Sequence, residues 1–223
     1  MTKIAELLKA FILAAAFTGF AHAQSADVAL VNQLSGEVLF QSEGAAASPA
    51  RAFMKVRLGD RFSVPAGGQI RVIYLQGGRQ ETWNGPASFR TGSEQSEPTS
   101  GQPAAVTTLP ASVPQRIAQV PELMRVAKLG RSGGVAVRGI GLPPRLNDAQ
   151  KAQVTAARDT YASMRAQLPA EDITPELYLY SVLQEFSLYE DLKPVVEEMS
   201  KRQPSSPEVQ DLVTLVKNRS AKK

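Results

Sequence analysis

The sequence predicts an α+β protein, with an N-terminal antiparallel β sandwich or roll and C-terminal antiparallel helical hairpins. Three observations predict this division. Between residues 26 and 90, apolar side chains alternate with polar ones, and turn residues interrupt them every few positions. After Asn147 the apolar spacing changes to three and four residues, which is typical of helices. Residues 24–145 carry more basic than acidic side chains, whereas residues 146–223 carry more acidic ones.

Residues 1–23 have the features of a secretory signal peptide. Lys3 and Lys9 precede the apolar run 10–20, and residues 21–23 have the A-x-A pattern of a cleavage site. We therefore expect cleavage between Ala23 and Gln24 and export to a bacterial periplasm; an uncleaved N-terminal anchor is the alternative. No later stretch approaches the roughly 20 apolar residues of a membrane helix, so we expect no transmembrane segment in the mature chain.

The first folded part is predicted to be a β domain over residues 24–90. A strand pair is expected at 26–41, followed by a strand that resumes at 52–56. The clearest signal is a hairpin, in which residues 69–75 form one strand, Gly77-Gly78 the turn and residues 79–83 the return. Both faces of 69–75 carry apolar side chains, so we expect this strand to be covered on both sides.

Two segments of different composition follow. Residues 91–113 are rich in Gly, Ser, Thr and Pro and predict a mobile loop. Residues 114–145 are basic and predict a helix, followed at 134–139 by a strand that returns to the sheet. Pro143-Pro144 then marks the domain boundary.

The last part, residues 146–223, predicts a helical domain. Helices are expected from Asn147 to about residue 167, from Thr174, over residues 189–202 and from Ser206. Short connections make neighbouring helices antiparallel. Pro194 lies inside the third helix and predicts either a kink or a helix that begins near Lys193.

The β domain resembles a known family. Its Gly36-x-Val38, Val56-x-Leu58-Gly59-Asp60, Gly67-Gly68-x-Ile70-x-Val72-x-Tyr74 and Gly77-Gly78 patterns are similar to those of the FecR-type periplasmic domain, over residues 28–89. The resemblance implies a compact β domain that senses or binds something in the cell envelope. The best-known members are signalling regulators with a transmembrane helix and a cytoplasmic anti-sigma segment. This chain shows neither feature, so that activity is not carried over.

The helical part resembles tetratricopeptide repeats over residues 148–219. The resemblance implies a concave surface that binds a protein or peptide, although so few repeats give little concavity. The pattern departs from the family at Leu192 and Met199, where alanine is usual. The alternative is that these helices complete the domain or mediate self-association. The matching positions are Leu179, Leu183, Ser187, Tyr189, Leu192, Val196, Met199 and Pro204.

Motifs for catalysis are weak, and we expect no enzymatic activity. Residues 130–134 match the G-x-S-x-G pattern of hydrolases, but the chain after Ala23 contains no histidine to act as base. Acidic pairs such as Glu190-Asp191 lie at predicted helix starts, which disfavours a glycosidase. Without histidine or cysteine, a zinc site is not expected, and we predict no cofactor.

We predict a periplasmic adaptor or sensor that binds an envelope protein or peptide and does not bind nucleic acid. The alternative is a module that binds peptidoglycan or another envelope polysaccharide, including an anionic one, through an aromatic platform and the basic span from Arg116 to Arg145. A core position for the aromatic residues is the competing interpretation. The glycan-binding candidates are Trp83 and Tyr74. The partner-binding candidates are Tyr178, Tyr180, Tyr189, Arg125, Lys128, Arg131 and Arg138.

Overall fold

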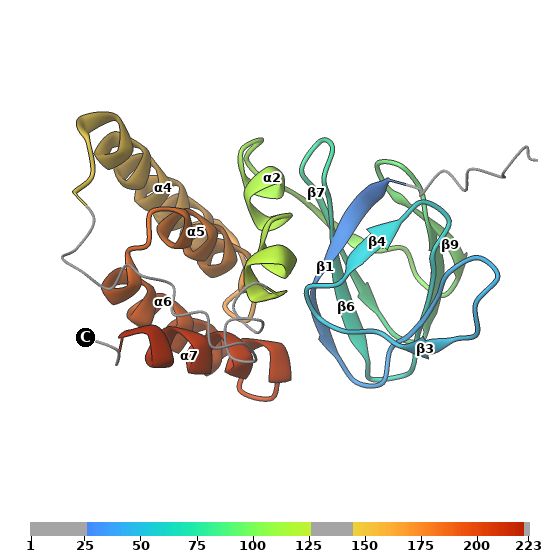
Figure 1. Ribbon diagram of the computed structural model, residues 1–223. Coiled ribbons are helices and arrows are strands. Elements are labelled where there is room, and N and C mark those ends of the chain that lie inside the picture. Colours follow the sequence, from blue (N-terminus) through green and yellow to red (C-terminus); the bar gives the residue numbers. More distant parts are fainter. Residues whose placement is uncertain (1–25, 126–144, 221–223) are drawn as a thin grey trace, which may run out of the picture.

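The computed structural model describes residues 26–125 and 145–220 and has the α+β fold class that the sequence predicts. Figure 1 shows the strands at one end of the molecule, the four long helices at the other, and α2 between them. The strands are β1 (Asp27–Ser35), β2 (Leu39–Gln41), β3 (Ser48–Pro49), β4 (Lys55–Arg57), β5 (Arg61–Val64), β6 (Gln69–Tyr74), β7 (Arg79–Asn84), β8 (Ala87–Thr91), β9 (Ser96–Ser100) and β10 (Ala105–Thr108). The helices are α2 (Val113–Ile117), α4 (Asp148–Gln167), α5 (Thr174–Glu185), α6 (Tyr189–Arg202) and α7 (Pro207–Ser220).

The strands form two five-stranded antiparallel sheets. Sheet A has the order β10-β7-β6-β1-β4, and sheet B has the order β3-β2-β5-β8-β9. Aromatic rings fill the core between them: Trp83 stacks on Phe89 with a centroid distance of 4.5 Å, and Phe89 stacks on Phe62 at 5.1 Å. The side chains that face this core come from both sheets, so each sheet covers the inner apolar face of the other.

The predicted hairpin is confirmed as β6 and β7. Ile73 pairs with Gln80, and residues 75–78 form the connection, with Gly77 and Gly78 both at positive φ. The connection is therefore two residues longer than a minimal hairpin loop. Apart from the half-buried Gln69, all residues of β6 are buried, which confirms that both faces of the strand are covered.

The predicted strand pair at 26–41 is wrong. β1 pairs with β6 and β4 in sheet A, whereas β2 pairs with β3 and β5 in sheet B. Gly36 has a positive φ, but it does not form the turn of a hairpin. The chain instead crosses from sheet A to sheet B at this point. A local turn signal cannot distinguish these two outcomes, because strand pairing is decided by distant segments.

The predicted mobile loop at 91–113 is also wrong. Strand β9 pairs with β8 and strand β10 pairs with β7, so each sheet gains an edge strand from this segment. β10 is the last strand of sheet A among the described residues. The returning strand expected at 134–139 lies outside the described residues.

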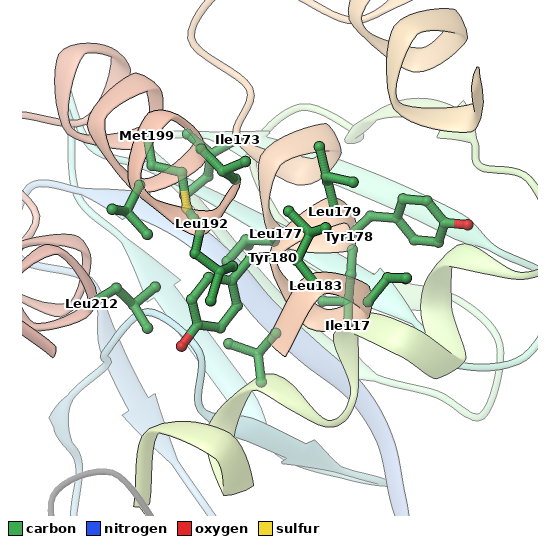
Figure 2. Packing of buried hydrophobic residues seen from close by; sticks show 14 of the residues in the cluster. Ile117, Ile173, Leu177, Tyr178, Leu179, Tyr180, Leu183, Leu192, Met199 and Leu212 are labelled. Carbon is green, nitrogen blue, oxygen red and sulfur yellow. The ribbon is translucent and has the colours of Figure 1, made fainter. Parts of the chain in front are cut away.

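The helices agree with the predicted ranges. Asn147 caps α4 in a capping box with Gln150, and the Ser206 hydroxyl accepts from the backbone N–H of Val209 at the start of α7. α6 begins at Tyr189 and contains Pro194, so the alternative start near Lys193 is wrong. α5 is buried over its first ten residues because α2, α4 and α6 all pack against it (Figure 2).

Candidate functional site

The predicted aromatic platform lies inside the sandwich. Trp83 is 2 % exposed and Tyr74 is fully buried. The indole N–H of Trp83 donates to Glu81 at 3.1 Å, and the Tyr74 hydroxyl bonds to the hydroxyl of Ser96 at 2.8 Å. Burial raises the pKa of the Tyr74 phenol above its ordinary value. These rings pack the core, so neither offers a face to a sugar.

The predicted partner-binding tyrosines do not form a surface either. Tyr178 and Tyr180 are 5 % and 0 % exposed and project from different sides of α5 into the helical core (Figure 2). Tyr189 is partly buried against the same core. Ile117 of α2 packs into this cluster beside Leu183, so this part of α5 is already occupied by the chain itself. A peptide would have to displace α2 to bind there.

The predicted basic span is only partly described. Arg125 is exposed and binds Glu122 at 2.7 Å, which lowers the pKa of that carboxyl group. Arg116 forms an ion pair with Glu185 on α5. Lys128, Arg131 and Arg138 lie outside the described residues, as do the predicted cleavage-site residues Ala23 and Gln24.

A buried polar seam joins the outer face of sheet A to the start of α5. We use "seam" for Asn32, Gln33, Arg71, Gln80, Thr82, Asp172 and Thr174. Its centre is Asp172, which is fully buried and accepts from Gln80 Nε2 at 2.7 Å and from the backbone N–H of Thr174 at 2.8 Å. The guanidinium of Arg71, also buried, lies 3.4 Å from the same carboxylate.

A β-bulge in β1 supplies two of the seam residues. Val31 pairs with Val72 and Gln33 pairs with Arg71, so Asn32 is an extra residue between them. Gln33 accepts from Arg71 Nη1 at 2.7 Å, and Asn32 donates to the Thr174 hydroxyl at 2.6 Å. In a regular strand, adjacent residues point to opposite faces, so two consecutive side chains on one face require such a bulge.

A second buried carboxylate anchors the loop that carries Asp172. Glu176 is fully buried and lies between Arg165 at 3.1 Å and Arg202 at 3.3 Å. Arg165 also donates to the backbone carbonyl of Asp172 at 2.6 Å. The two clusters thus connect sheet A with α4, α5 and α6 through paired and hydrogen-bonded groups, and such groups are stabilising when both partners stay in place.

These buried groups are held by one another. Asp172 and Glu176 are each engaged by an arginine, and the described residues contain no group of three or more His, Cys, Asp or Glu side chains that could hold a metal ion. The seam therefore fixes how the two halves are joined.

No helix of the described part is long and apolar enough to cross a membrane.

Three features remain on the surface. The first is strand β10, whose four residues are all exposed at the edge of sheet A. The second is a hollow of about 410 Å³ on sheet B that is lined in part by Arg61 and Arg90. The third is a polar hollow of about 520 Å³ between the β6–β7 and β8–β9 connections, lined in part by Arg79, Glu94 and Glu97.

Comparisons with known proteins found no relatives. No family model matches the chain, and no match was found among the curated proteins or the solved structures.

Proposed function

We propose that this protein is a non-enzymatic adaptor of the bacterial envelope, in which the joined β and helical parts present the edge of sheet A to an extended segment of another protein. Export rests on the predicted signal peptide, and the envelope setting rests on the FecR-type resemblance. The observation that carries the binding mode is the composition of strand β10. Its sequence, Ala-Val-Thr-Thr, is uncharged, and Val106 is 46 % exposed.

The other three sheet edges of the described part each carry a feature that discourages strand addition. β4 carries Lys55 and Arg57, β3 is two residues long and ends in Pro49, and β9 contains Glu97 and Pro98. Charges, prolines and short length are the common means by which proteins protect sheet edges. β10 alone among these edges has no charge and no proline within the strand.

An open edge favours one kind of partner. The unpaired N–H and C=O groups of an edge strand bind an extended peptide by adding it to the sheet, and alternate side chains then supply specificity. The exposed Val106 and the two threonines of β10 favour a partner segment that is weakly charged and rich in β-branched residues. The helical part contributes rigidity, because the seam holds it against the outer face of sheet A.

The test is site-specific photo-crosslinking in the periplasm. A photo-reactive residue at position 106 is expected to capture a partner, and the same residue at position 58 is not. Leu58 is the matched control because it is 56 % exposed but lies in a turn outside β10. Val106→Lys should abolish capture from a probe at position 107, whereas Leu58→Lys should leave it intact.

Two results would contradict the proposal. Equal capture from positions 58 and 106 would mean that the edge is not a specific binding element. Capture of this same chain alone would mean that β10 mediates self-association instead. Sequencing the N-terminus of the purified protein checks the export step, since cleavage should leave Gln24 as the first residue.

A further inference from the structure

The outer face of sheet B carries two arginines that face each other without an acidic partner. Arg61 of β5 pairs in register with Arg90 of β8, so their side chains lie side by side on the same face. Both residues are exposed, and neither forms an ion pair among the described residues. Like charges directly opposite each other destabilise a sheet, so this arrangement has a cost that a bound anion would reverse.

One acid lies in the same row, and a single acid offsets only one of the two positive charges. Glu97 of β9 is in register with Arg90 but makes no ion pair with it, and its side chain lines the separate polar hollow. The Arg90 guanidinium instead rests against the Leu58-Gly59 turn, where a Cβ on Gly59 would lie 3.4 Å from Nη2. The turn therefore supports Arg90 in a position from which it lines the sheet B hollow together with Arg61.

The rest of the hollow combines hydroxyl groups with apolar and aromatic side chains. Ser63, Ser88 and Thr99 supply the hydroxyls, and Leu39, which is 44 % exposed, supplies an aliphatic contact. The other lining residues are Phe40, Gln41, Ala47, Phe62 and Phe89. This mixture suits a sugar chain, since hydroxyls and guanidinium groups bond to sugar oxygens and an aliphatic side chain covers the C–H face of a ring. Arginine also matches the two oxygens of a carboxylate with its planar fork.

A peptide suits this face less well than a sugar chain. The hollow lies across β2, β5, β8 and β9, and all of these strands except β9 are paired on both sides. Peptides that bind sheets use unpaired edge groups, as proposed above for β10. Recognition on the sheet B face must rely on side chains, and those that line the hollow combine two arginines and three hydroxyl groups with apolar and aromatic groups.

We propose that the sheet B face binds a carboxylate-bearing polysaccharide, with Arg61 and Arg90 as the carboxylate-binding residues. The charge complementarity of the arginine pair carries this assignment, and the combination of hydroxyl groups with an exposed aliphatic side chain favours a sugar. The site is separate from β10, so it adds a second binding function and does not depend on the first. Trp83 and Tyr74 take no part in it, because both are buried in the core.

The test is calorimetric titration of residues 24–223 with oligogalacturonate, using neutral dextran and oligoglutamate for comparison. We expect binding of oligogalacturonate that weakens as salt rises, no binding of dextran, and at least tenfold weaker binding of oligoglutamate. Arg61→Gln and Arg90→Gln should each weaken oligogalacturonate binding about tenfold or more. Arg61→Lys should also weaken it, because lysine keeps the charge but loses the fork.

The control variant is Arg51→Gln, which removes the same charge from an exposed residue outside the hollow. It should bind as the unmodified protein does, and so should Val106→Lys, which separates this test from that of the proposed adaptor function. Thermal melts of Arg61→Gln and Arg90→Gln should show no loss of stability, because each relieves a like-charge contact. Equal losses in Arg51→Gln, equal binding of oligoglutamate, or no binding of oligogalacturonate would each overturn the proposal.

Discussion

Removal of the Asp172 carboxylate should destabilise the whole described fold. In Asp172→Ala, the buried Arg71 keeps only the exposed carboxylate of Glu171, 3.9 Å away, and Gln80 Nε2 and the Thr174 N–H lose their acceptor. Breaking a buried ion pair from one side costs about 3–5 kcal/mol. At roughly 2–4 °C per kcal/mol for a chain of this size, the melting temperature should fall by about 6–20 °C.

Urea unfolding measures this effect with two independent probes. Trp83, the only tryptophan, reports on the sandwich core by fluorescence, while circular dichroism at 222 nm reports mainly on the helices. Because the seam joins both parts, the two signals should change together in the unmodified protein. In Asp172→Ala both midpoints should fall, whereas Asp148→Ala, at an exposed position on α4, should change little.

A double-mutant cycle isolates the contribution of the pair. Arg71→Met/Asp172→Ala should lose less stability than the sum of Arg71→Met and Asp172→Ala, because the double variant leaves no buried charge unpaired. Additive losses, or a loss below about 1 kcal/mol in Asp172→Ala, would refute the claim that the two charges are coupled in a buried site.

Three further predictions concern other parts of the fold. Gly77→Ala should lower the free energy of unfolding by about 1–2 kcal/mol, because residue 77 has a left-handed backbone. Gly78→Ala should lower it more, because the added Cβ would also lie 2.7 Å from the Leu109 carbonyl oxygen. Equal urea midpoints for the two variants would contradict this. Glu176→Gln should lower stability by about 3 kcal/mol or more by leaving two arginines without their buried carboxylate, which the same melts would measure. Burial raises the pKa of Tyr74, so its phenol loses a proton at lower pH in the unfolded chain than in the folded one. The free energy of unfolding should therefore fall above about pH 10 by roughly 1.4 kcal/mol per pH unit. Tyr74→Phe should flatten that slope, and an unchanged slope would contradict the raised pKa.

Local signals in the sequence predicted the elements whose formation depends on neighbouring residues. The alternation of Ile70, Val72 and Tyr74 and the two glycines that follow identified the β6–β7 hairpin. Caps and prolines identified the starts of α4 and α7 to within a residue. These signals act over one turn or one strand, so they can be read without knowing the rest of the fold.

Features that depend on distant segments were not predictable in this way. The polar composition of 91–113 indicated a loop, yet β9 and β10 form because β8 and β7 offer them backbone partners. The strand pair expected at 26–41 gave no sign of the bulge that places both Asn32 and Gln33 in the seam. The one visible clue to the seam was Arg71 inside an otherwise apolar strand, since a buried arginine requires an acceptor from elsewhere in the fold.

The seam also limits where this protein can bind partners. Sheet A has one face in the sandwich core and the other against α2 and the start of α5, so neither face is open along its central strands. α5 is covered as well, so Tyr178 and Tyr180, two of the predicted partner-binding residues, are not available on its surface. The β10 edge of sheet A remains exposed. The outer face of sheet B, which carries Arg61 and Arg90, is exposed as well. An uncharged edge and a cationic face suit different chemistries, so the proposed protein segment and the proposed acidic glycan would occupy separate surfaces of the same fold.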